Sequence, residues 1–149
     1  MNLPILGISM GDPFGNGPEI TVKALADKTL YTRCRPVVIG DACCMAYAAQ
    51  VAKKVSGLDL KIRAITDIRE AQFQYGVIDV YDMGIVRAGD IPGDANAPKP
   101  FGVGACALGG EAAFRYVVKV IELAMAGEVD ATITNALSKE AINMAGHHY

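Results

Sequence analysis

The sequence predicts an α/β fold, a doubly wound and mainly parallel sheet with helices on both faces. Apolar, strand-like runs alternate with helical patterns along the whole chain of 149 residues. That alternation is typical of parallel sheets, in which a helix crosses over between successive strands. The turn after the first strand is rich in glycine, as it is in α/β proteins that bind ligands there. A chain of this length, 52% hydrophobic and 20% charged, is sufficient for one domain with its own core.

The first part of the chain is expected to alternate strand and helix twice. Leu3–Ser9 is an apolar run that predicts a strand, and Pro18–Asp27 predicts a helix, because proline is favoured in the first helical turn. Arg35–Gly40 is short and rich in valine and isoleucine, which predicts a buried strand. A helix is then expected from Ala42 to about Val55, with Asp41 as its N-cap residue.

The middle of the chain predicts two strands and a long loop. Leu60–Ile65 alternates apolar residues with lysine and arginine, as an outer strand does, and Val77–Tyr81 predicts a further strand. Residues 84–101 contain three glycines and three prolines and are expected to form a long exposed loop. A solvated connector is favoured for this loop, and an arm that packs on another subunit is the alternative.

The last part of the chain predicts a long helix, a short strand and a short helix. Gly102–Ala126 has helical periodicity, Ala131–Thr134 is a strand-like run, and Ser138–Ala145 is a helical pattern that ends at a glycine. The expected apolar stripe of the long helix consists of Ala113, Val117, Val120, Ile121, Leu123 and Ala124.

The turn after the first strand is the first candidate site. Gly11, Gly15 and Gly17 permit unusual backbone angles and a close approach to a ligand. Asp12 is the only ionisable side chain in the turn, and it is a candidate to orient a substrate, a metal-bound water or a lysine. The turn is neither a Walker A loop nor a dinucleotide fingerprint, since it lacks the Gly-Lys-Ser/Thr of the one and the third small residue of the other. A purely structural turn is the alternative.

The second candidate site follows the last expected strand and carries hydroxyl, amide and ammonium groups. Its polar residues are Thr134, Asn135, Ser138 and Lys139. The carboxyl ends of parallel strands meet at one edge of a sheet, so we expect this segment to lie on the same side as the glycine-rich turn. Lys139 is the best candidate to contact a phosphate or a developing alkoxide, and an ordinary surface lysine is the alternative.

Three segments resemble the 4-hydroxythreonine-4-phosphate dehydrogenase family, whose close relatives oxidise 4-phospho-threonate or 4-phospho-erythronate. Met10–Glu19 resembles the opening signature of the family, and Arg35–Asp41 resembles its second strand and the following turn. Thr134–Ala141, followed by Ala-Gly-His, resembles the family segment Thr-Ala-Pro-x-Asn-Lys-Glu-Ala…Ala-Gly-His. At Asn135, Ala136 and Ser138 the family usually has alanine, proline and asparagine or histidine. Phe14 and Asn16 also depart from the family pattern, which usually has alanine and isoleucine there.

The resemblance implies an isocitrate/isopropylmalate dehydrogenase-like fold, of which residues 1–149 form the N-terminal α/β portion of a longer, two-subdomain enzyme of pyridoxine biosynthesis. It implies an NAD-dependent oxidation of the 3-hydroxyl of 4-phosphooxy-threonine or a related 4-phospho-sugar acid, followed by decarboxylation. It also implies one divalent metal ion, and zinc, magnesium, manganese and cobalt are the alternatives. The metal-binding histidines, the Gly-His-Thr-Glu motif and the NAD region of the family have no counterpart here, so both cofactors are expected to bind outside this chain.

Asp12 and Lys139, the ionisable side chains of the two candidate segments, are the candidate catalytic residues. The candidate substrate-binding residues are Gly11, Gly15, Gly17, Thr134, Asn135, Ser138 and His147. The partner is a small phosphorylated substrate, and the family's shared site implies a homodimer. We expect the isolated chain to be inactive. The alternatives are a non-catalytic phospho-ligand-binding domain and one half of a split enzyme.

Composition excludes other classes of function. The net charge of −2 provides no basic field for nucleic acid or for an anionic membrane. No apolar run approaches the roughly 18 residues of a membrane span. The four cysteines include no Cys-x-x-Cys spacing, and the first residues are not a secretory signal, so we expect a cytoplasmic protein with reduced thiols and no zinc site.

Overall fold

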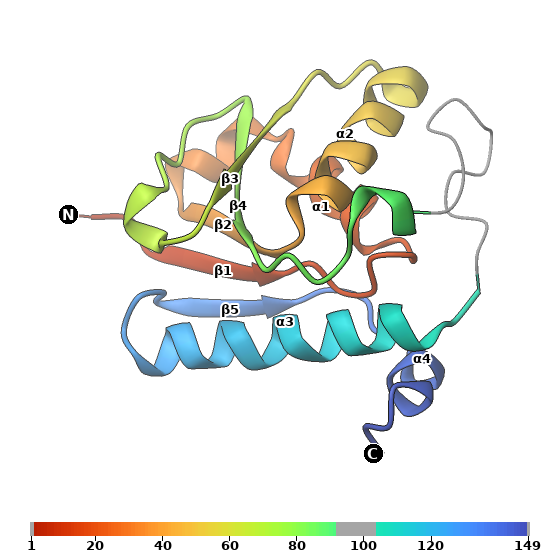
Figure 1. Cartoon of the computed structure of the whole chain (residues 1–149). Helices are drawn as coiled ribbons and strands as arrows, with labels where there is room; N and C mark the ends of the chain where they lie inside the picture. Colours follow the sequence, from red (N-terminus) through yellow and green to blue (C-terminus); the bar gives the residue numbers. More distant parts are fainter. Residues whose placement is uncertain (1, 92–103, 149) are drawn as a thin grey trace.

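The computed structural model describes residues 2–91 and 104–148. Five strands form one sheet in the order β3-β4-β2-β1-β5, and every neighbouring pair is parallel (Figure 1). The strands are β1 (Ile5–Ser9), β2 (Arg35–Gly40), β3 (Lys61–Ile65), β4 (Val77–Asp82) and β5 (Ala131–Thr134). The predicted parallel sheet is confirmed, and β3 is the outer strand that its alternating sequence predicts.

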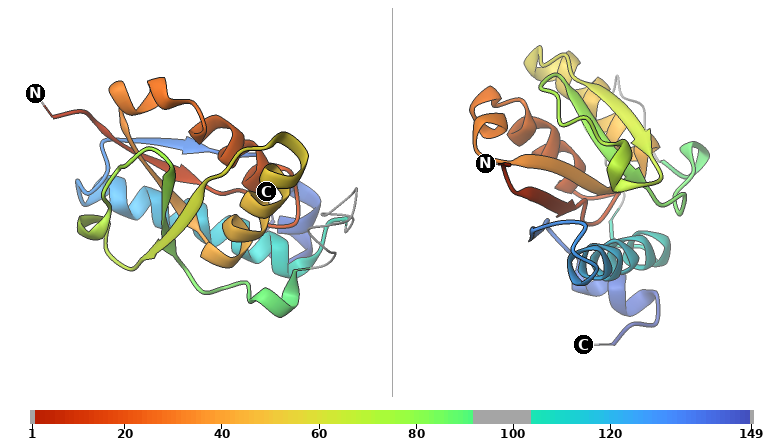
Figure 2. Two further views of the ribbon diagram at one scale, coloured as in Figure 1. Left: turned by 90° about the horizontal axis from the view of Figure 1, so that it is seen from above. Right: turned by 90° about the vertical axis from the view of Figure 1, so that its left-hand side faces the viewer.

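The helices cover both faces of this sheet. They are α1 (Gly17–Leu25), α2 (Ala42–Ser56), α3 (Ala107–Met125) and α4 (Lys139–Met144). Helices α1 and α2 pack together on one face, and α3 lies along β1, β2 and β5 on the other (Figures 1 and 2). Helix α4 packs on α3 rather than on the sheet. The doubly wound arrangement is therefore confirmed.

Three short 3-10 helices were not predicted. They are η1 (Lys28–Thr32), η2 (Ile68–Glu70) and η3 (Ala88–Asp90). Aspartates begin the first two, because Asp27 and Asp67 each accept a hydrogen bond from the backbone N–H two residues later. Helix η3 lies in the predicted loop 84–101, of which residues 92–101 are outside the described residues. In the described part of the chain, no helix combines the length and the apolar content needed to cross a membrane.

Helix α3 begins later than the sequence predicts, and its buried stripe includes Ala113, Val120 and Leu123 as predicted but not Ile121. Residues 104–106 are not helical, and residues 102–103 lie outside the described residues. Ile121, which was expected in the stripe, is 49% exposed, whereas Tyr116 is completely buried. The buried positions are Gly109, Gly110, Ala112, Ala113, Tyr116, Val120 and Leu123. The sheet sets this rotation, because Gly7 of β1 has no side chain and Val120 occupies the space that one would fill.

Asp41 is not the side-chain cap of α2 that the sequence predicts. The residue is at the N-cap position, but its fully buried carboxylate accepts two backbone N–H groups from the segment after β4, at 2.9 Å each, and the hydroxyl of Tyr116. Burial and the neighbouring carboxylate raise the pKa of Tyr116, so its hydroxyl remains a donor. Asp82 replaces Asp41 as the cap, since the Ala42 N–H donates to Asp82 Oδ1 at 3.0 Å. Asp41 thus joins β2, β4 and α3.

Candidate functional site

The carboxyl ends of β1 and β5 lie side by side where the chain leaves the sheet in opposite directions. Ser9 of β1 is the register partner of Thr134 of β5. After β1 the chain enters α1 on one face, and after β5 it enters α4, which packs on α3 at the other face (Figure 1). Open α/β sheets bind ligands at such a switch point. The expectation that both candidate segments lie at one edge of the sheet is confirmed.

Backbone contacts require glycine at two positions of the β1 turn. Gly11 has a φ of 81°, and a Cβ there would lie 2.5 Å from the carbonyl oxygen of Ala136. The Asp12 N–H donates to that same oxygen at 3.1 Å, which joins the two segments directly. A Cβ at Gly17 would overlap the carbonyl oxygen of Met10. Both glycines therefore permit a close packing of backbone on backbone.

Asp12 is buried between the β1 turn and the first turn of α3. The carboxylate is 8% exposed, and its Oδ1 accepts the Phe14 N–H at 2.9 Å. A Cβ at Gly109 would lie 2.8 Å from the same oxygen, so this part of α3 rests directly against the carboxylate. The Asp12 carbonyl also accepts the Gly15 N–H at 3.0 Å, and Gly15 itself has ordinary space for a side chain.

The environment of Asp12 changes its acidity. Burial raises the pKa of the carboxyl above its ordinary value, and the hydrogen bond from the Phe14 N–H partly offsets the rise. The N-terminal turn of α3 places the positive end of a helix dipole beside this oxygen. Carboxyl groups with a raised pKa are typical of acid–base sites.

Asn135 holds the two candidate segments together. Its amide nitrogen donates to the Gly17 carbonyl at 3.2 Å and to Thr21 Oγ1, and its Oδ1 accepts the Ala136 N–H at 3.2 Å. The side chain therefore links the end of β5 to the first turns of α1. The sequence predicts Asn135 as a substrate contact, but the amide donors already have partners inside the protein, which indicates a positioning role.

The end of β5 and the start of α4 carry three further candidate residues, which are Thr134, Ser138 and Lys139. Ser138 is the N-cap of α4, and its Oγ accepts the Ala141 N–H at 3.1 Å. Lys139 is the first residue of α4 and is exposed, and within residues 2–91 and 104–148 no carboxylate pairs with it. Thr134 is also exposed. The β5–α4 segment, which contacts the β1 turn through Ala136, thus carries an exposed hydroxyl and an unpaired ammonium group.

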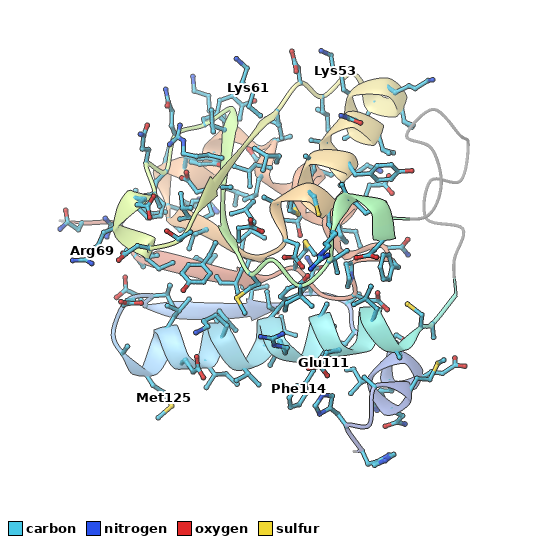
Figure 3. All side chains as sticks on the ribbon, viewed as in Figure 1. Lys53, Lys61, Arg69, Glu111, Phe114 and Met125 are labelled. Carbon is cyan, nitrogen blue, oxygen red and sulfur yellow. The ribbon has the colours of Figure 1, made fainter. Side chains whose placement is uncertain are left out.

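His147 lies apart from these residues. Its ring is stacked on Phe114 of α3, with 3.7 Å between ring centroids, and its Nε2 is 2.6 Å from Glu111 Oε2. Figure 3 shows Glu111 and Phe114 on the side of α3 that faces away from the sheet. Within the described residues, no group of three or more histidine, cysteine, aspartate or glutamate side chains is arranged to hold a metal ion.

Sequence reasoning missed the glycine pair at the start of α3. Gly109 accommodates the Asp12 carboxylate, and Gly110 lies against the backbone of Ala141 and Ile142 in α4. Two adjacent glycines inside a helical pattern were the available signal, because glycine weakens a helix unless close packing requires it.

Comparison with known proteins gives consistent matches. The family model described as "Pyridoxal phosphate biosynthetic protein PdxA" matches residues 32–149. The chain is 41% identical over 147 residues to a D-threonate 4-phosphate dehydrogenase from Cupriavidus necator, with 99% of this chain and 40% of the relative covered.

Solved structures agree with this similarity. A 4-hydroxythreonine-4-phosphate dehydrogenase from Burkholderia phymatum has a TM-score of 0.85 and 39% identity, covering 100% of this chain and 41% of that one. The enzyme of the same name from Klebsiella pneumoniae has a TM-score of 0.73 and 30% identity, covering 99% of this chain and 40% of that one. The present chain therefore spans about two fifths of the length of these relatives.

Proposed function

Because this chain belongs to the pyridoxal phosphate biosynthetic protein PdxA family, we propose that it forms part of a dehydrogenase for a phosphorylated hydroxy acid. The similar proteins are named for D-threonate 4-phosphate and 4-hydroxythreonine-4-phosphate, and we propose a substrate of this class. The oxidised group would be the 3-hydroxyl, with loss of carbon dioxide afterwards.

One observation carries the proposal, which is the contact between the β1 turn and the β5–α4 segment. The hydrogen bond from the Asp12 N–H to the Ala136 carbonyl puts a buried carboxyl and the unpaired Lys139 on adjacent segments. A substrate of the proposed class carries a phosphate, a carboxylate and an alcohol. It therefore needs a cation to bind its charges and a group that orients the alcohol.

The residues would divide these tasks. Lys139 would bind an anionic group of the substrate, and Asp12 would orient the substrate or hold a proton at its carboxyl oxygens. Gly11 keeps the two segments in backbone contact, Gly17 lets α1 begin close to the Met10 carbonyl, and Asn135 links the end of β5 to Gly17.

We further propose NAD and a divalent metal as cofactors of the whole enzyme. The described residues of this chain do not supply a metal-binding group, and the β1 turn lacks the dinucleotide fingerprint. We propose that both bind to polypeptide other than this chain, that the enzyme is a cytoplasmic homodimer, and that the isolated chain is inactive.

Calorimetric titration with D-threonate 4-phosphate tests the proposal. We expect Lys139→Ala to weaken binding by about three- to tenfold, the value of one exposed charged hydrogen bond. Lys61→Ala is the matched control, because Lys61 is an exposed lysine at the opposite edge of the sheet (Figure 3). Equal loss of affinity in the two variants would contradict a site at Lys139. Steady NADH production by the isolated chain with NAD and Mn²⁺ would overturn the prediction that it is inactive.

A further inference from the structure

A cavity lies at the end of the sheet where the strands begin, opposite the end that carries the candidate functional site. Its volume is about 480 Å³, and its apolar walls are Ile5 at the start of β1, Ile68 of η2, and Ala71 and Phe73 from the segment before β4. Three charged residues, Arg35, Arg69 and Glu128, complete the lining. Figure 3 shows Arg69 at this end of the molecule. The cavity lies outside the proposed dehydrogenase site, and its apolar walls belong to the hydrophobic core or pack against it.

Arg35 is the central charge of the cavity. It is half-buried at the start of β2, and its Nε donates to the Leu3 carbonyl at 2.7 Å. Its guanidinium carbon lies 5.4 Å from the centroid of the Phe73 ring. Within residues 2–91 and 104–148, no carboxylate pairs with Arg35 and its two terminal nitrogens donate to no protein group. A guanidinium that is fixed at Nε and against an aromatic ring presents these two nitrogens as a preformed fork for a carboxylate.

Phe73 is held against Arg35 in a strained conformation. Its φ is 52°, the only positive φ of a non-glycine residue in the described part of the chain. The buried Asp79 maintains it, because Asp79 Oδ2 accepts the N–H groups of Gln72 at 3.1 Å and Phe73 at 2.9 Å. Asp79 Oδ1 also accepts Arg63 Nη1 at 3.3 Å. A bulky residue held in such a conformation indicates a functional position.

We propose that this cavity binds a small monocarboxylate with an apolar body. The carboxylate would bind to the terminal nitrogens of Arg35, and the apolar body would lie against Ile5, Ile68 and the Phe73 ring. Arg69 contributes little, since its side chain is 89% exposed and its Nε and Nη2 already bind Asp67. Glu128 opposes a second negative charge in the ligand, so inorganic phosphate is disfavoured.

Titration of the full 149-residue chain with 4-methylpentanoate, followed by backbone amide NMR, tests the proposal. We expect saturable shifts at residues 5, 35 and 68–73. Arg35→Lys removes the planar fork and should weaken binding by about tenfold or more. The matched control is Arg33→Lys, because Arg33 is an exposed arginine two residues away that does not line the cavity. Absence of saturable shifts up to about 10 mM ligand, or equal affinity in both variants, would overturn the proposal.

A second variant separates binding from folding. Asparagine tolerates the left-handed backbone, so Phe73→Asn should retain the fold while it loses the aromatic wall and binds more weakly. Unchanged affinity in this variant would contradict a role of the ring.

A comparison of L-leucine with 4-methylpentanoate identifies the source of the carboxylate. Tighter binding of L-leucine than of 4-methylpentanoate indicates an amino acid whose ammonium group contacts Glu128, and the reverse order indicates a simple carboxylate. Both results support the proposed class. Equal binding of 4-methylpentan-1-ol, or tighter binding of inorganic phosphate, would overturn it.

Discussion

The contact between α3 and α4 depends on a glycine, and replacing Gly110 with alanine tests this dependence. A Cβ at Gly110 would overlap the carbonyl group of Ala141 and lie 2.6 Å from the backbone nitrogen of Ile142. All of these atoms belong to the backbone, so no change of side-chain rotamer relieves the overlap. In the Gly110→Ala variant, α4 has to move away from α3.

The cost follows from what α4 buries. Ala141 is fully buried and Ile142 is 4% exposed. Exposure of a buried isoleucine costs about 1.5–3 kcal/mol, and one methyl group costs about 0.8 kcal/mol. Alanine in place of a helical glycine stabilises the helix by about 1 kcal/mol, which offsets part of this cost. We therefore expect a net loss of about 1–3 kcal/mol in the free energy of unfolding. Because α4 packs on α3 and not on the sheet, undocking of α4 limits the loss.

Urea denaturation followed by circular dichroism measures this loss, and amide hydrogen exchange shows whether α4 is the part that opens. Gly89→Ala is the matched control. A Cβ at Gly89 meets no atom within 4 Å and its φ is not positive, so we expect a change within about 0.5 kcal/mol. Stabilisation of the Gly110→Ala variant by the helix propensity of alanine, with unchanged exchange in α4, would refute the reasoning.

Two further predictions concern buried polar groups. Tyr116→Phe removes a hydrogen-bond donor from the buried Asp41 carboxylate, and it should lower the free energy of unfolding, measured by urea denaturation, by about 1–2 kcal/mol. Tyr31→Phe is the control. An equal loss in both variants would contradict the role of this hydrogen bond. For Asp12, the raised pKa means that the folded state binds its proton more tightly than the unfolded state does. The corresponding stabilisation is fully present below the ordinary value of 3.8 and is lost as the pH rises through the higher folded pKa. Asp12→Asn should therefore be more stable relative to the parent at about pH 7 than at about pH 3, and a pH-independent difference in urea denaturation would count against the raised pKa.

The sheet could be predicted from the sequence, whereas the details that depend on distant contacts could not. Short apolar runs and glycine or aspartate boundaries are local signals, and they placed every strand. Asp41 is the N-cap residue of α2 as predicted, but its side chain does not cap the helix, because its donors come from the segment after β4 and from Tyr116 of α3, which no local pattern indicates. The exposure of Ile121 on α3 could not be predicted, because Gly7, more than 100 residues earlier, determines which helix residue can approach the sheet.

The candidate site shows the same limit. The β1 turn and the β5–α4 segment could be brought together from the sequence alone, because parallel strands place their carboxyl ends at one edge. The side chain of Asn135 donates to Gly17 and Thr21 instead of facing outward, and the sequence does not indicate these three-dimensional contacts. His147 was grouped with the site by resemblance, and only the structure places it against Phe114.

The most direct test of the central claim is the mapping of D-threonate 4-phosphate on the backbone amide NMR spectrum of this chain. If the β1 and β5 ends form the substrate site, saturable shifts should be largest at residues 11–17 and 134–139. Shifts confined to other regions, or their absence at residues 11–17 and 134–139 under saturating ligand, would contradict the account.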